Sequence, residues 1–259
     1  WVEEAGELYL AIRLRVQTYL TLLTDGLYLA AFASSLRIAA TATLLALFVA
    51  FPIALGMARW QDHGPFVRDE AEMDDYMHQV AGLVGYLLTD LFAWYSRRIA
   101  ERKEYLRPLA RDYGLALQTV NIIRGMRKDY ERGWVFVPRT YYESVGLTRD
   151  GIFDPANADK AVLLVNKLAD KAEKHLINGI AYITSFPCIQ HRIRLGCMWP
   201  LFFAVKTLAI SRNNIQVILD EAKISRQQVA EIIKKTTLFG WSNRWLKSYY
   251  QELLTPVIG

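Results

Sequence analysis

A polar stripe is predicted on one face of a helix in the middle of the chain. Gln118, Asn121, Gly125 and Asp129 follow one another at spacings of three and four residues, so they share one side of a helix. Arg124 lies within the same run. Amides, a guanidinium and a carboxylate that face inward can hold Mg²⁺ and phosphate oxygens. The same stripe would also suit a solvent-facing surface, and periodicity alone leaves both interpretations open.

The stripe must be positioned by a run of helices in the second part of the chain. Apolar residues recur at three- and four-residue spacing from Val80 to Phe92, after an acidic run that suits a helix start. The stripe's own helix is predicted over residues 106–132. Other helices are predicted over 157–183, 189–211 with a break near Pro200, 225–235 and 242–254. No alternating strand pattern is convincing, so the expected fold class is all-α.

An uncharged stretch runs from Ile38 to Ala58, and its 21 residues are long enough to cross a bilayer. A buried helix of a soluble protein is the alternative, but such helices are rarely apolar all round for that length. The sequence therefore predicts one transmembrane helix before the bundle. Arg59 follows it directly, which places the C-terminal side in the cytoplasm.

Composition excludes some classes of function. The formal net charge is +5, and basic residues are mixed with acidic ones. No basic patch alternates with stacking aromatic residues, so no nucleic-acid partner is expected. The two cysteines, Cys188 and Cys197, lack the further ligands of a zinc site and are predicted to be buried thiols.

Two motifs resemble the squalene/phytoene synthase family. The first is Tyr76 to Gly85, and the second is Gln118 to Asp129 with the following Glu131-Arg132-Gly133. The resemblance covers residues 56–259. It implies a partial isoprenoid-synthase helical bundle that condenses two isoprenyl diphosphates, farnesyl or geranylgeranyl, head to head. It also implies Mg²⁺ to draw off diphosphate, and NADPH if squalene is formed.

The resemblance assigns roles to individual residues. Tyr76 matches the family's catalytic tyrosine, and Gln118, Asn121 and Arg124 match substrate-binding residues. Asp129 and Asn121 match metal-site residues. Gly125 stands where the family has the first of two aspartates, and nothing before residue 56 resembles the family's first Asp-rich motif. These departures predict a truncated domain with little or no synthase activity.

Residues 1–59 resemble a fragment of a spermidine/putrescine-type ABC transporter permease. The expected division is therefore a permease-like segment over 1–58, with its membrane helix at 38–58, and a truncated synthase-like domain over 59–259. A transporter fragment and a membrane-tethered, non-catalytic prenyl-diphosphate-binding protein remain as alternative functions. The expected location is membrane-associated, with the synthase-like part in the cytoplasm and an isoprenyl diphosphate as its ligand.

Overall fold

The computed structural model describes residues 2–4, 10–12, 26–61 and 67–255. The chain forms two compact units, Trp1–Phe51 and Pro52–Gly259, and each is described by itself. In the first unit β1 (Val2–Glu4) pairs antiparallel with β2 (Leu10–Ile12). These two short strands belong to the first unit and do not alter the all-α fold class expected for the synthase-like part. They contain too few residues for an alternating pattern to stand out.

Helix α2 (Gly26–Gln61) begins in the first unit and contains the whole stretch predicted to cross a membrane. Its described side chains are exposed, among them Phe32, Leu36 and Phe51. Among the described residues, the helix that meets the length and hydropathy of a membrane span is α9 (His191–Ser211). Because 56% of that helix's most apolar window is buried, α9 fits the core of the bundle.

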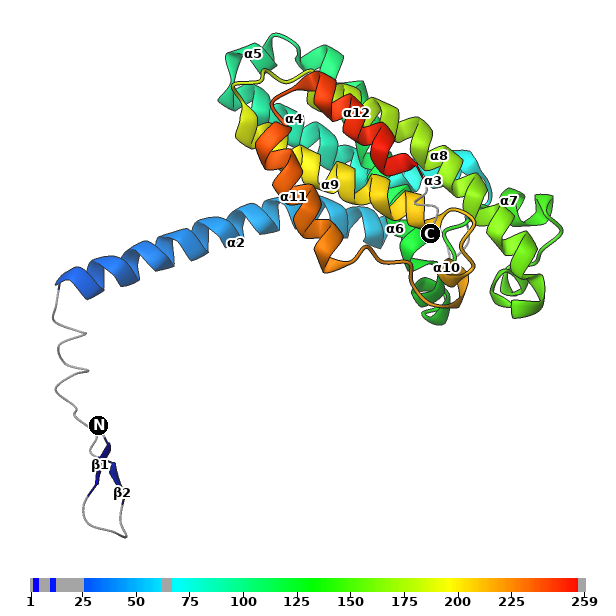
Figure 1. Cartoon of the computed structure of the whole chain (residues 1–259), viewed down its shortest axis with the longest axis horizontal. Coiled ribbons are helices and arrows are strands. Elements are labelled where there is room, and N and C mark those ends of the chain that lie inside the picture. The colour runs from blue at the N-terminus through cyan, green and yellow to red at the C-terminus, as the bar shows by residue number, and fades with distance from the viewer. Residues whose placement is uncertain (1, 5–9, 13–25, 62–66, 256–259) are drawn as a thin grey trace. The chain divides into compact units, whose positions relative to one another are not determined.

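The second unit is a bundle of helices (Figure 1). Helices α6 (Lys103–Glu131) and α8 (Ala158–Thr184) pack along each other, and α9 contacts both. The all-α prediction is confirmed for this unit. The remaining elements are α3 (Glu70–Met77), the π-helix η1 (His78–Gly82), α4 (Leu83–Tyr95), α5 (Arg97–Ala100), α7 (Arg139–Ser144), the 3₁₀ helices η2 (Asp150–Phe153) and η3 (Pro155–Asn157), α10 (Gln216–Leu219), α11 (Arg226–Phe239) and α12 (Asn243–Leu254).

Local sequence signals explain where several helices begin. The side chain of Asp69 accepts a hydrogen bond from the backbone N–H of Glu72 at 2.9 Å and caps α3. Ser225 and Gln228 form a capping box at the start of α11. The predicted break near Pro200 is wrong, because α9 continues through it. A proline inside a helix costs about 3 kcal/mol, and the fully buried neighbours Met198, Leu201 and Phe202 offset it through packing.

Two glycines let α6 approach the helices that carry the first motif. A Cβ atom on Gly85 would lie 2.4 Å from the carbonyl oxygen of Ala110. A Cβ atom on Gly114 would lie 2.6 Å from the carbonyl oxygen of Ala81. No side chain fits at these distances. Backbone-to-backbone packing of η1 and α4 on α6 therefore fixes Tyr76, at the end of α3, against the polar stripe.

Candidate functional site

The structure brings four of the predicted site residues together. Tyr76 hydrogen bonds with Gln118, and Asn121 Nδ2 donates to Gln118 Oε1 at 3.5 Å. Burial, followed by the negative charge of Asp129, raises the pKa of Tyr76 to about 12. The phenol is only 5% exposed and stacks on Phe136 with ring centroids 4.9 Å apart. The Tyr76 hydroxyl is therefore protonated at neutral pH and lies at the edge of the stripe.

Asp129 supplies the carboxylate of this cluster. Its side chain is 22% exposed, and Arg132 Nη1 lies 3.9 Å from Asp129 Oδ1. Burial raises the pKa of Asp129 although Arg132 acts to lower it. Beside Asp129 a small pocket is lined by apolar residues, among them Trp134 and Phe136. The carboxylate thus faces a mostly apolar wall, where its charge is poorly solvated.

Arg124 points to a different partner. It forms a short ion pair from Nε to Glu221 Oε1, at 2.7 Å. Glu221 Oε2 also binds Lys128 Nζ at 2.5 Å and Lys223 Nζ at 2.6 Å. The Glu221 side chain is only 4% exposed. Three cations from α6 and from the segment after α10 therefore converge on one buried carboxylate.

The charge of Glu221 is held by its cations. Burial acts to raise the pKa of this carboxyl, but hydrogen bonds from Lys128, Lys223 and Arg124 outweigh it and lower the pKa to about 2. Sequence reasoning missed Glu221 and Lys223 because they lie in a short connection about a hundred residues from the stripe. No helical period links them to it, and only the packing of α10 on α6 brings them near.

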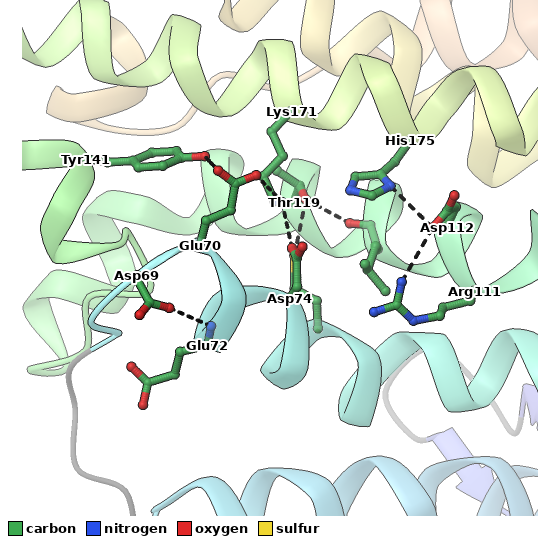
Figure 2. A network of polar contacts seen from close by, with 12 residues as sticks. Asp69, Glu70, Glu72, Asp74, Arg111, Asp112, Thr119, Tyr141, Lys171 and His175 are labelled. Carbon is green, nitrogen blue, oxygen red and sulfur yellow. Dashed lines mark hydrogen bonds and ion pairs between the residues drawn. The ribbon is translucent and has the colours of Figure 1, made fainter. Parts of the chain in front are cut away.

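A second polar network holds α3, and with it Tyr76, in place (Figure 2). Lys171 on α8 is 5% exposed, and its Nζ lies 2.8 Å from Glu70 Oε1 and 2.6 Å from Asp74 Oδ1. Tyr141 from α7 donates to Glu70 Oε2 at 2.6 Å. Hydrogen bonds, first from Lys171 and then from Tyr141, lower the pKa of Glu70. The network ties α3 to α7 and α8.

The same face of α8 also binds α6. His175 Nδ1 lies 3.5 Å from Asp112 Oδ1, and Asn178 Nδ2 donates to Asp112 Oδ2 at 2.6 Å (Figure 2 shows the His175 contact). Burial lowers the pKa of His175 more than the charge of Asp112 raises it, so the imidazole is neutral at neutral pH. α8 is thereby fixed to both of the helices that carry the motifs.

Replacement of Lys171 by methionine should destabilise the second unit. The change leaves the carboxylates of Glu70 and Asp74 without their shared cation. Breaking a fully buried pair costs 3–5 kcal/mol, and because both carboxylates are partly exposed we expect a loss of about 2 kcal/mol in the free energy of unfolding. Urea denaturation measures it. The matched change of exposed Lys234 to methionine should cost less than about 0.5 kcal/mol, and equal losses in the two variants would contradict this role.

Mg²⁺ was expected at Asp129 and Asn121 from the resemblance. Among residues 67–255 and the other described segments, no group of three His, Cys, Asp or Glu side chains is placed to hold a metal ion. Position 125, one turn before Asp129, has no side chain to offer. Mg²⁺ usually takes one or two carboxylates and completes its octahedron with water and substrate phosphates. A Mg²⁺ ion at Asp129 would therefore need substrate phosphates to complete its coordination, and the metal role of Asp129 and Asn121 stays a prediction.

The geometry defines a helical bundle in which a buried tyrosine lies beside a stripe of amide and carboxylate side chains. Next to the stripe is a cluster of arginine and lysine side chains, which are residue types that bind phosphate. A family model for squalene/phytoene synthase matches residues 49–228, more than half of the chain. The chain therefore belongs to the squalene/phytoene synthase family, and the family predicted from the two motifs is confirmed.

Individual relatives agree with this. The chain is 30% identical over 208 residues to squalene synthase of Homo sapiens, covering 78% of the chain and 47% of that protein. It is 28% identical over 172 residues to a protein named inactive squalene synthase 2 of Arabidopsis thaliana, covering 64% of the chain and 40% of that protein. The chain thus spans about half the length of the curated relatives it matches.

Solved structures share the fold. The complex of TcSQS with the ligand E5700 matches with a TM-score of 0.69 and 27% identity, covering 80% of this chain and 59% of that one. A dehydrosqualene synthase in complex with a ligand matches with a TM-score of 0.53 and 19% identity, covering 79% of this chain and 65% of that one. The second likeness concerns the fold alone.

Proposed function

We propose that the chain binds an isoprenyl diphosphate, such as farnesyl or geranylgeranyl diphosphate, at the polar stripe of α6. The observation that carries this is the convergence of Arg124, Lys128 and Lys223 on one buried carboxylate. Three cations held around one anion form a favourable place for a diphosphate, which offers more oxygens and more charge than a carboxylate. Binding replaces the Glu221 carboxylate with the diphosphate.

Tyr76 has a separate role in this proposal. Its pKa of about 12 keeps the proton on the hydroxyl at neutral pH. The ring stacks on Phe136, so the hydroxyl faces the polar stripe from an apolar surround. A buried, protonated phenol can donate a hydrogen bond to a departing diphosphate or lie beside a developing carbocation. We assign Tyr76 to this role, with Gln118 holding its hydroxyl in place.

Head-to-head condensation of two such diphosphates is the family reaction, and we propose that this chain performs it poorly. Mg²⁺ would neutralise the leaving diphosphate, and NADPH would be used if the product were squalene. The stripe offers only Asp129 for the ion, because Gly125 lacks a carboxylate. A relative named as inactive, in Arabidopsis thaliana, lies among the matches and is compatible with a member that binds without turnover.

Membrane association is also part of the proposal. The uncharged stretch 38–58 lies in one continuous helix, α2, and crosses the bilayer so that residues 59–259, the synthase-like domain, face the cytoplasm. The permease-like reading of residues 1–59 has less support, because the synthase family model already begins at residue 49. A membrane-tethered binder of prenyl diphosphates is therefore the preferred alternative to an active synthase.

Titration with farnesyl thiodiphosphate, an analogue that resists ionisation, tests the proposal. Arg124→Ala should weaken binding about tenfold, since a hydrogen bond between charged groups contributes roughly 1.5–3 kcal/mol. Arg127→Ala is the matched control, because Arg127 pairs with Glu131 on the same helix and should change little. Asp129→Ala should weaken binding only when Mg²⁺ is present. Equal effects of the two arginine variants would contradict the assignment.

A further inference from the structure

Three turns of the second unit meet at the end of the bundle where α5 and the start of α12 lie (Figure 1). They are residues 94–98, 185–190 and 240–243. The first two are joined by a hydrogen bond from Gln190 Nε2 to Ser96 Oγ at 3.3 Å. Arg102, just after the first turn, donates from Nη1 to the carbonyl oxygen of Ser185 at 2.8 Å. These contacts fix the α4–α5 and α8–α9 connections against each other.

A buried arginine joins the second and third turns. Arg194 is fully buried, and its Nη1 donates to the carbonyl oxygen of Phe186 at 2.8 Å. Its Nη2 donates to the carbonyl oxygen of Gly240 at 3.2 Å and to Asn243 Oδ1 at 2.5 Å. The three turns are therefore a built surface and not independent loops.

Each turn presents a large apolar side chain to solvent. Trp94 is 84% exposed, Ile189 is 78% exposed, and Tyr95 and Trp241 are also mostly exposed. Single exposed apolar residues are ordinary, but several large ones gathered at one end of a bundle indicate an interaction site. Trp and Tyr carry a polar atom on an apolar ring, which suits a boundary between water and hydrocarbon.

The charge of this end is positive, although Lys103 Nζ pairs with Asp90 Oδ1, just outside these turns, at 3.1 Å. Over residues 94–105, 186–192 and 240–244 there are six Lys or Arg residues and two Glu residues. Arg97 pairs with Glu101 at 3.2 Å yet its side chain remains 92% exposed. The cations are Arg97, Arg98, Arg102, Lys103, Arg192 and Arg244.

We propose that this end, which we call the tryptophan–arginine end, docks on the anionic surface of a lipid bilayer. Its aromatic and aliphatic side chains enter the interfacial region, and its arginines bind lipid phosphates. The apolar groups come singly from separate turns, with cations between them. A bilayer accepts such a surface without matching its shape, whereas a folded protein partner needs a continuous complementary face.

The inference rests on the proposed function in one respect: it extends the proposed membrane association to a defined surface. Gln118 follows Lys103 by fifteen residues on α6, which separates them by roughly 22 Å along the helix axis. Changes at the tryptophan–arginine end should therefore leave binding of farnesyl thiodiphosphate intact. Failure of docking and failure of diphosphate binding are then separate results.

A label on Cys188 tests the docking directly. Cys188 is exposed on the second turn, whereas Cys197 is buried and its pKa is raised by burial to about 12, so a maleimide dye at pH 7 reacts at Cys188. Vesicles of phosphatidylcholine with phosphatidylserine should shift the dye's emission to the blue, and shallow spin-labelled lipids should quench it. Charge reversal of Arg97 and Arg98 to glutamate should return the emission of the Cys188 label toward its value in water.

The control moves the label to Leu163→Cys in a Cys188→Ser chain, because Leu163 is exposed near the other end of α8. That label should keep its emission in water. Three results would overturn the inference. The Cys188 label could keep its emission in water while the chain sediments with the vesicles, or the chain could stay in solution. The blue shift could also appear without vesicles when only the chain concentration is raised. The last result would assign this end to a second copy of the chain.

Discussion

Replacing Gly125 with aspartate should let Mg²⁺ stabilise the chain without any ligand, an effect that the unmodified chain lacks. The new carboxylate would lie one turn before Asp129 on the same face of α6. A Cβ atom at position 125 would be 3.1 Å from Asp129 Oδ2, so the Asp129 carboxylate must move by a few tenths of an ångström. Its side chain is flexible and partly exposed, so the pair can form. Two carboxylates four residues apart repel each other, and a divalent cation relieves that repulsion.

Thermal unfolding with and without Mg²⁺ measures this effect. At a Mg²⁺ concentration about ten times its dissociation constant, the Gly125→Asp chain should gain roughly 1.4 kcal/mol of stability that the unmodified chain does not gain. Gly125→Asn is the matched control, since it has the same shape and no charge. Equal Mg²⁺ responses from the aspartate and asparagine variants would contradict the account of the missing carboxylate. Affinity for pyrophosphate should rise in the aspartate variant only when Mg²⁺ is present.

Replacing Glu221 with glutamine should increase the affinity for inorganic pyrophosphate. The neutral amide keeps the shape of the side chain but leaves Arg124, Lys128 and Lys223 without their shared anion. A diphosphate then binds three unpaired cations and no longer has to displace a carboxylate. We expect the dissociation constant to fall about tenfold or more, which corresponds to roughly 1.4 kcal/mol. Isothermal titration calorimetry measures it.

The control is Asp220→Asn, which removes the same charge from the exposed neighbouring residue. An unchanged or weaker affinity in a folded Glu221→Gln chain would show that Glu221 does not compete with phosphate.

Acid stability gives a second readout of the Glu221 substitution. The pKa of Glu221, about 2, lies below the ordinary 4.5, so its stabilisation is complete above pH 4.5 and is lost as the pH falls toward 2. The glutamine variant should lack that part of the acid-induced loss.

The helices and the stripe could be predicted because periodic patterns determine them locally. The predicted range 106–132 differs from α6 (Lys103–Glu131) by only a few residues at its start. Tyr76 was linked to the stripe by resemblance alone, and the structure brings it to Gln118 because Gly85 and Gly114 let η1 and α4 approach α6. The roles given to these residues remain predictions.

The parts that could not be predicted depend on contacts between segments far apart in the sequence. Glu221 meets Arg124 only after α10 packs on α6. The prediction that both cysteines are buried is wrong for Cys188, which lies in the exposed turn before α9. Its apolar neighbours suggested a core position, but Ile189, the next residue, is itself exposed, whereas Phe186 is buried. Apolar composition identifies a turn of this kind poorly, because function can keep such residues on the surface.

Incubation of the purified chain with labelled farnesyl diphosphate, Mg²⁺ and NADPH, followed by separation of bound ligand from hydrocarbon product, shows whether the chain binds its ligand and whether it converts it. We expect farnesyl diphosphate to be bound and recovered unchanged, because one carboxylate of the metal pair is absent at Gly125. Mg²⁺-dependent formation of a condensed hydrocarbon would contradict the impaired reaction. Absence of any bound ligand would contradict the diphosphate site itself.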